Sequence, residues 1–126
     1  MSTAEVGTMT TQEVANRFNE LAQQGNWAQI QEELFADNAV SIEPPQVPGL
    51  QSVEGKEAIK QKGERFQSTV EEWHGGYSSE PLVAGNYFAV AMGMDANMKG
   101  MGRMKMDEIA VYEVKNGKIV KEQFFF

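Results

Sequence analysis

Glu43 is the first side chain of the sequence whose position points to acid–base chemistry. It ends a short stretch typical of a strand, Ala39–Glu43, and directly precedes Pro44 and Pro45, which cannot continue a β-ladder. A carboxyl group that enters an apolar pocket has a raised pKa and exchanges protons near neutral pH. We predict Glu43 to be a catalytic base; the alternative is a solvated loop glutamate.

Two more carboxylates lie on expected C-terminal strands. Asp107 shares strand parity with Ile109 and Val111, so it points into the interior if these aliphatic side chains form the core. A slip of one residue, or a bulge, turns Asp107 to water instead. Glu122 shares parity with Phe124 and either lines a pocket or is an edge charge that opposes aggregation. We predict a catalytic Asp107 and a ligand-binding Glu122.

His74 is the single histidine of the chain, and cysteine is absent. These counts exclude thiolate and multi-histidine metal sites, so we predict neither a metal ion nor a cofactor. Glu72 lies two residues before His74, on the same side of an expected strand, which allows a proton relay. His74 is therefore a third catalytic candidate, although a lone histidine is more often structural.

Methionine is concentrated in one region, because six of the eight lie between Met92 and Met106. Met92 and Met94 share one strand face, and Met104 and Met106 share a face of the next strand, with parity opposite to Asp107. If Asp107 points inward, the methionines form an exposed, flexible and apolar outer face, which is typical of an interface. We predict a homodimer through this face; the alternative is a methionine-lined pocket with Asp107 outside.

The composition describes one acidic globular domain. The chain has 126 residues, with 11 Lys and Arg against 18 Asp and Glu, a net charge of −7. This charge disfavours binding to nucleic acid and to anionic membranes. No apolar run reaches the roughly 20 residues of a membrane span, and no secretory signal is evident. We expect a cytoplasmic protein with a loose tail over residues 1–9 and a single domain over residues 10–126.

Three helices are expected in the first half of the chain. Thr10 and Glu13 form a capping box for the first helix, which Gly25 terminates. Asn26 caps a second helix, and Lys56–Gln67 forms a third. This third helix contains Gly63, which is unfavourable at a helix interior and indicates a solvent-facing position or a close approach to a strand.

Strands dominate the second half. Turn signals at residues 84–86, 99–100 and 116–117 delimit strands over residues 70–80, 87–98, 103–115 and 118–126. Gly75 and Gly76 indicate a bulge that bends the first of them. The order is typical of an α+β fold in which three helices pack on a curved antiparallel sheet. Such a sheet leaves a cavity, which is the default ligand site; we expect Phe18, Phe66 and Phe124 at its rim.

Three strings in this order resemble the nuclear transport factor 2-like superfamily with its cystatin-like cone, and within it the SnoaL-like branch. They are Leu34–Val40 (LFADNAV), Val53–Ile59 (VEGKEAI) and Asn116–Val120 (NGKIV), and the resemblance covers residues 10–126. It implies the fold more specifically than the function, since the superfamily contains isomerases, polyketide cyclases, dehydratases, epoxide hydrolases and non-catalytic binding modules.

The resemblance also implies site residues. In ketosteroid isomerase-like members a general base before a proline matches Glu43, and a second acid on a later strand matches Asp107 loosely. The tyrosine that donates to the oxyanion in that family matches Phe18, which has no hydrogen-bond donor. We therefore predict that the chain is not a working ketosteroid isomerase.

Two functions follow from these observations. The first is a lyase, isomerase or cyclase that transfers protons on a small apolar carbonyl compound, with Glu43 as base and Asp107 or His74 as its partner. The second is a non-catalytic dimeric module that binds a small ligand or another chain. A buried Glu43 beside a cavity favours the first, and a filled cavity favours the second.

Overall fold

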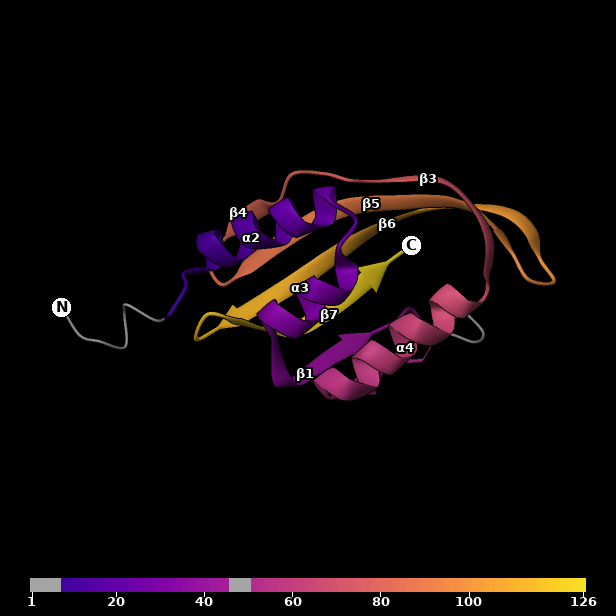
Figure 1. Cartoon of the computed structure of the whole chain (residues 1–126). Helices are drawn as coiled ribbons and strands as arrows, with labels where there is room; N and C mark the ends of the chain where they lie inside the picture. Colours follow the sequence, from indigo (N-terminus) through magenta and orange to yellow (C-terminus); the bar gives the residue numbers. More distant parts are fainter. Residues whose placement is uncertain (1–7, 46–50) are drawn as a thin grey trace.

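The computed structural model describes residues 8–45 and 51–126. Most of the predicted tail over residues 1–9 lies outside these ranges. Within them, three helices lie on one side of a curved sheet (Figure 1). None of these helices combines the length and apolarity needed to cross a bilayer.

The three helices form where the sequence predicts them. Helix α2 (Thr11–Gln23) begins with the predicted capping box, in which the Thr10 hydroxyl accepts from the Glu13 amide and the Glu13 carboxylate accepts from the Thr10 amide. Gly25 ends it in the left-handed region, with φ of 71°. Helix α3 (Trp27–Leu34) has no side-chain cap from Asn26, contrary to expectation, and α4 spans Lys56–Ser68.

Seven strands form one sheet in the order β2-β1-β7-β6-β5-β3, and β4 pairs with β5. Their bounds are Phe35–Ile42 for β1, Val53–Glu54 for β2, Val70–Ser78 for β3, Leu82–Ala84 for β4, Tyr87–Met98 for β5, Gly102–Lys115 for β6 and Lys118–Phe125 for β7. The predicted α+β fold with three helices on a curved sheet is confirmed, and one pair, β1 with β7, is parallel rather than antiparallel. The sheet is therefore mixed.

Local turn chemistry sets the register of the long strands. Asn116 and Gly117 have φ of 51° and 75°, the two positive angles of a type I′ hairpin, and they join β6 to β7. The predicted bulge is present, since the β3–β5 register shifts between Trp73 and Gly75. The bulge bends β3, the strand at one edge of the sheet, and so contributes to the curvature of the sheet.

An aromatic cluster fills the core between α2 and the inner face of the sheet. The Phe18 ring lies 5.3 Å from the Phe88 ring and 4.8 Å from the Tyr112 ring, and Phe88 and Tyr112 stack at 4.9 Å. Phe18 is 1% exposed, and burial of such a side chain contributes about 1.5–3 kcal/mol. The core is therefore complete at this end of the sheet.

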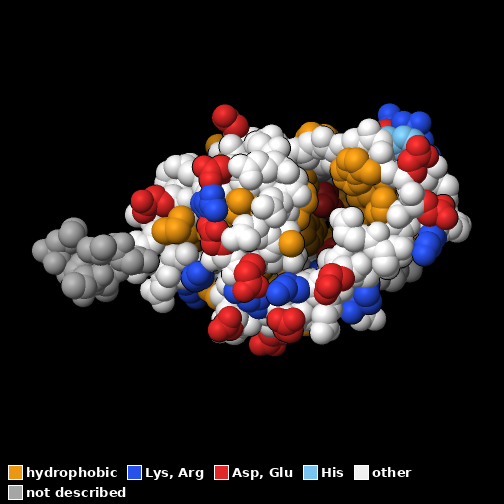
Figure 2. Space-filling view, viewed as in Figure 1, with side chains coloured by type: hydrophobic (Ala, Val, Ile, Leu, Met, Phe, Trp, Pro, Cys, Tyr) orange, Lys and Arg blue, Asp and Glu red, His pale blue; other side chains and the backbone are white. Residues whose placement is uncertain are grey.

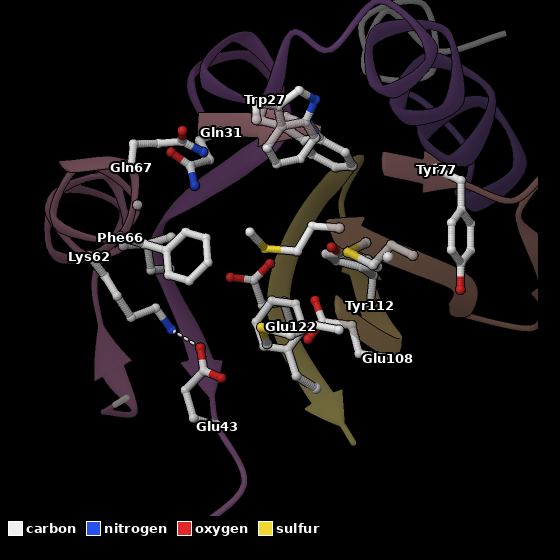
Figure 3. Close-up of a pocket in the computed structure, with 18 residues that line it drawn as sticks. Trp27, Gln31, Glu43, Lys62, Phe66, Gln67, Tyr77, Glu108, Tyr112 and Glu122 are labelled. Carbon is white, nitrogen blue, oxygen red and sulfur yellow. Dashed lines mark hydrogen bonds and ion pairs between the residues drawn. The ribbon is translucent and has the colours of Figure 1, made fainter. Parts of the chain in front are cut away.

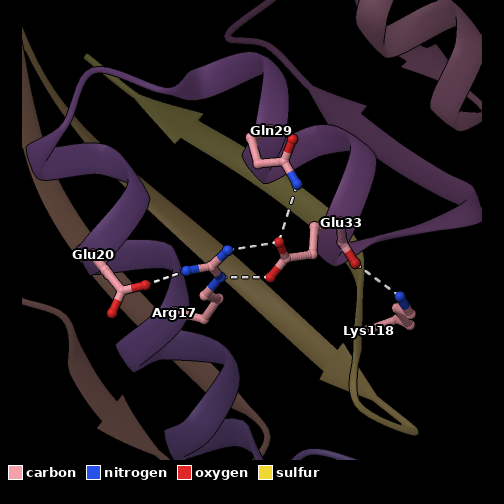
Figure 4. Close-up of polar contacts among 5 residues, drawn as sticks. All are labelled: Arg17, Glu20, Gln29, Glu33 and Lys118. Atoms are coloured by element: carbon pink, nitrogen blue, oxygen red, sulfur yellow. Dashed lines mark hydrogen bonds and ion pairs between the residues drawn. The ribbon is translucent and has the colours of Figure 1, made fainter.

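A polar cluster on the outside joins α2 to α3 (Figure 4). The Arg17 guanidinium donates to both oxygens of Glu33, at 2.6 and 2.8 Å, and also contacts Glu20. Gln29 donates to the same Glu33 carboxylate at 3.1 Å, while Lys118 at the start of β7 donates to the Glu33 carbonyl at 2.7 Å. The Arg17 guanidinium lowers the pKa of Glu33 to about 2.

Candidate functional site

A cavity of about 250 Å³ opens where the helices do not fill the concave sheet. Figure 2 shows the hollow, with hydrophobic side chains on its walls and an acidic side chain inside. Figure 3 shows the residues around it. They come from α3, α4, β3, β5, β6, β7 and the end of β1, and they are Trp27, Gln31, Glu43, Ile59, Lys62, Gly63, Phe66, Gln67, Trp73, Tyr77, Met92, Gly93, Met94, Met106, Glu108, Tyr112, Glu122 and Phe124.

A chain of hydrogen bonds crosses one end of the cavity. The Lys62 ammonium donates to Glu43 Oε2 and to Ser41 Oγ, both at 2.7 Å. The Ser41 hydroxyl donates to Glu122 Oε2 at 2.7 Å. Because an ammonium has only donors, the single Ser41 proton is left for Glu122. Oε2 of Glu122 is thus an acceptor, and a proton bound by this carboxyl resides on Oε1.

Parallel pairing of β1 with β7 creates this chain. Ser41 lies opposite Glu122 in the β1–β7 register, and both residues are buried, at 1% and 6% exposure. Lys62 reaches them from α4, and its ammonium lies 5.7 Å from the centre of the Phe124 ring. The Glu43 side chain is only 8% exposed. The ion pair between Lys62 and Glu43 is therefore shielded from water, and removal of either partner would leave the other charge buried and unpaired.

Two carboxyl groups at this end titrate near neutral pH. Burial raises the pKa of Glu122 to about 7, while the Ser41 hydrogen bond and the Lys62 charge oppose that rise. Burial also raises the pKa of Glu108 to about 7, helped by the charges of Glu43 and Glu122. The cavity thus holds two carboxyl groups that are matched to proton transfer at neutral pH.

Tyr112 connects these acids to the aromatic core. Its side chain lines the cavity beside Glu108 and Glu122 (Figure 3). Burial, the two neighbouring carboxylates and the hydrogen-bonding interaction with Glu122 raise the pKa of the Tyr112 phenol, so the hydroxyl keeps its proton. Among the described residues, no group of three acidic or histidine side chains lies in an arrangement that could hold a metal ion.

Four predicted site residues line the cavity: Glu43, Glu122, Phe66 and Phe124. Their catalytic and binding roles remain predictions. Phe18 was expected at the rim, but it lies in the aromatic core and does not line the cavity. The reason is that α2 covers the end of the sheet away from the hollow, so its inward side chains meet Phe88 and Tyr112.

Asp107 and His74 do not reach the cavity. On β6 the even-numbered residues Met106 and Glu108 face the hollow, so Asp107 points the other way, where its carboxylate accepts from the Tyr77 hydroxyl at 2.6 Å. Of the two orientations open to Asp107 in the sequence, the outward one is present, and a catalytic role for Asp107 at this cavity is not supported by its position. His74 is exposed and lies 3.0 Å from the Asn97 side-chain oxygen and 3.8 Å from Glu72, the relay partner expected for it, but neither His74 nor Glu72 lines the cavity.

The methionines also face the other way from the expectation. Met92, Met94 and Met106 line the cavity, and Met104 shares strand parity with Met106. The outer face of β6 and β7 instead carries Ile109 and Phe125, which are paired in register and exposed by 45% and 49%. The methionine-lined pocket is the arrangement present, so a methionine dimer surface is wrong.

Sequence reasoning missed Ser41, Lys62, Glu108 and Tyr112. A signal for Lys62 existed, because it lies three residues after Ile59 and four before Phe66, on the apolar side of α4. Glu108 lies on the same face of its strand as Met104 and Met106, and that face was expected to point to solvent. Nothing local identified Ser41, whose importance depends on a partner 81 residues away.

Comparisons with known proteins agree with the fold described above. The sequence profile of the SnoaL-like domain matches residues 9–126. The chain belongs to the SnoaL-like domain family. A Mesorhizobium loti protein described as a SnoaL-like polyketide cyclase is 40% identical to this SnoaL-like domain, with a TM-score of 0.87 over 94% of this chain and 100% of the other.

More distant structures share the fold of this SnoaL-like domain. A Xanthomonas campestris protein of unknown function with a cystatin-like fold has a TM-score of 0.75 at 14% identity, over 93% and 90% of the two chains. A Catenulispora acidiphila protein with a ketosteroid isomerase-like fold, in complex with trimethylamine, has a TM-score of 0.69 at 16% identity, over 93% and 87%. No protein of curated function matches the sequence.

Proposed function

We propose that this SnoaL-like domain is a proton-transfer enzyme of the lyase, isomerase or cyclase type that acts on a small carbonyl compound. The proposal rests on one observation: Glu108 and Glu122, each with a pKa of about 7, face the same largely apolar cavity. A pair of carboxyl groups that share a proton at neutral pH supplies both a base and an acid.

The surroundings divide the two roles. The Lys62 charge favours ionisation of both carboxyl groups, but Glu122 also accepts the Ser41 hydrogen bond, which favours its ionised form, so Glu122 is the base. Glu108 lies beside the Glu43 and Glu122 charges, which favour its protonated form, so Glu108 is the acid. This assignment replaces the pairing of Glu43 with Asp107 or His74, and Glu43 instead neutralises Lys62.

The proposed step moves one proton. Glu122 Oε1 takes a proton from the carbon next to the carbonyl group, and the electron pair of that C–H bond forms an enolate. Protonated Glu108 donates a hydrogen bond to the enolate oxygen. Return of the proton to another carbon, closure of a ring or loss of a leaving group completes an isomerase, cyclase or lyase reaction respectively.

Hydrogen–deuterium exchange tests this step without knowledge of the natural substrate. Small ketones such as cyclohexanone and 4-phenyl-2-butanone are incubated with the protein in D₂O, and loss of the α-proton signal is followed by NMR. We expect exchange above the buffer rate, with a maximum near pH 7, and a decrease of roughly 10²- to 10⁴-fold in Glu122→Gln. The matched control Asp107→Asn removes a carboxylate outside the cavity and leaves the rate unchanged.

A binding role without chemistry is the second candidate. The cavity is open and partly lined by aromatic and thioether side chains, which suits a small organic ligand, and the Catenulispora protein of this fold was crystallised with trimethylamine. Saturable ligand binding, with no exchange above buffer for any ketone, would support this role over the enzymatic one.

We also propose that two copies pair through the outer face of the sheet. The exposed side chains of Ile109 and Phe125, which are paired in register, support an apolar interface there, in place of the methionines. A second copy would bury the same residues on both sides, as an interface with twofold symmetry requires.

A further inference from the structure

We propose that Gln31 and Gln67 form a second polar subsite at the mouth of the cavity, which binds an uncharged hydroxyl or amide group of the ligand. The ligand is then polar at both ends, with its carbonyl group at Glu108 and Glu122 and an apolar middle. This inference rests on the proposed function, because that function places the carbonyl group.

The two glutamines lie at the opposite end of the cavity from the carboxylates. Gln31 extends from α3 and Gln67 from α4, and their amide groups lie close together in Figure 3, which draws no hydrogen bond from either to another lining residue. Each amide offers two donors and an acceptor. Because neither side chain is charged, the pair is suited to a neutral hydroxyl or amide rather than to an ion.

The middle of the cavity separates the two polar ends. The Phe66 ring projects between these ends (Figure 3), and the cavity lining also includes Met92 and Met106. Apolar groups of this kind favour a ring or a short hydrocarbon chain and offer no hydrogen bonds. A ligand that spans the cavity therefore places its polar groups at its two ends.

Gly63 supports this arrangement, because the fold does not require a glycine there. It lies inside α4, where glycine is the least favourable residue after proline. A Cβ atom at Gly63 would meet the Gln31 amide nitrogen at 3.5 Å, an ordinary contact, and the residue is not in the left-handed region. The open side of Gly63 lines the cavity next to Gln31. We infer that this space receives the ligand as it passes to the glutamines.

Two ketones that differ by one hydroxyl group test the subsite. They are 4-phenyl-2-butanone and 4-(4-hydroxyphenyl)-2-butanone, and calorimetry gives the dissociation constant of each. We expect the wild type to bind the hydroxylated ketone about tenfold more tightly, which corresponds to about 1.4 kcal/mol and is typical of one well-placed hydrogen bond. The double variant Gln31→Leu, Gln67→Leu should lose this preference and keep its affinity for the ketone without the hydroxyl.

Two more variants separate recognition from folding. Gly63→Ala should raise the melting temperature through helix propensity, and it should weaken binding of the hydroxylated ketone more than that of its partner. A lower melting temperature would overturn the argument that the fold does not need this glycine. Gln12→Leu, an exposed substitution on α2, should change neither affinity.

The outcomes distinguish this inference from the proposed function. Equal affinity of the wild type for the two ketones, or a hydroxyl preference that survives in the double variant, would overturn the subsite alone. A preference that depends on the glutamines, without any hydrogen–deuterium exchange, would overturn the enzymatic function and leave the subsite. Failure of the wild type to bind either ketone would overturn both.

Discussion

Replacement of Glu122 by glutamine should make the protein more stable at alkaline pH. Folding raises the pKa of this carboxyl from 4.5 to about 7. Between these values the folded state binds more protons than the unfolded state, so stability falls as pH rises. The neutral amide of Glu122→Gln carries no such penalty and still offers an oxygen to the Ser41 hydroxyl.

The size of the effect follows from the pKa difference. One pKa unit corresponds to about 1.4 kcal/mol, so the change from 4.5 to about 7 corresponds to about 3 kcal/mol of stability. The stabilisation is fully present below pH 4.5 and is lost as pH rises through 7. For a domain of this length, about 3 kcal/mol shifts the melting temperature by roughly 10 °C.

Urea unfolding at pH 5 and pH 8, followed by circular dichroism, measures the difference. We expect the wild type to lose stability between these values and Glu122→Gln to lose about half as much, because Glu108 has a similarly raised pKa and is retained in the variant. Glu71→Gln, an exposed control on β3, should retain the pH dependence of the wild type.

Two results would contradict this reasoning. The first is a wild type that is equally stable at both pH values. The second is a Glu122→Gln variant that is less stable than the wild type at pH 8, because that would mean that the ionised carboxylate stabilises the fold.

Three other perturbations have defined outcomes. Ser41→Ala removes a hydrogen bond that lowers the pKa of Glu122, so the rise of the ketone exchange rate with pH should move to higher pH; an unchanged profile would argue against Glu122 as the base. Glu33→Gln removes a carboxylate whose pKa Arg17 lowers to about 2. In acid unfolding, the variant should therefore lose less stability than the wild type between pH 4.5 and 2. An identical acid transition would count against the ion pair. Ile109→Glu places a charge on the exposed outer face and should convert a dimer into a monomer in light scattering after gel filtration, whereas a wild type that is already monomeric would refute the proposed pairing.

The sequence predicted the elements whose signals are local. The capping box at Thr10 and Glu13, the turn at Asn116 and Gly117, and the bulge at Gly75 each depend on neighbouring residues only, and each is present. Backbone preferences at these positions act before any tertiary contact forms, which is why they can be identified without a structure.

The face of β6 could not be predicted in the same way. Both of its faces carry apolar side chains, since Ile109 and Val111 alternate with Ala110 and Tyr112. Alternation of hydrophobic residues therefore does not say which face meets the helices. The predicted acid was Asp107, and the acid in the cavity is its neighbour Glu108.

Long-range pairing decided the rest of the site. Ser41 contacts Glu122 only because β1 lies parallel to β7, and no turn or cap encodes that neighbourhood. The acidic site residues that sequence reasoning did identify, Glu43 and Glu122, were found as carboxylates at strand positions. Their connection through Ser41 and Lys62 required the tertiary structure.

The position of β7 between β1 and β6 has a consequence for how the protein assembles. Residues 118–125 leave the ribosome after every other strand, yet they occupy an interior place in the sheet. Until they arrive, β1 and β6 each present an open backbone edge toward the gap, which is a template for wrong pairing with other chains. Pairing of β7 with β1 and β6 also brings Glu122 next to Ser41. The hydrogen bond between these two residues therefore forms only when the sheet becomes continuous.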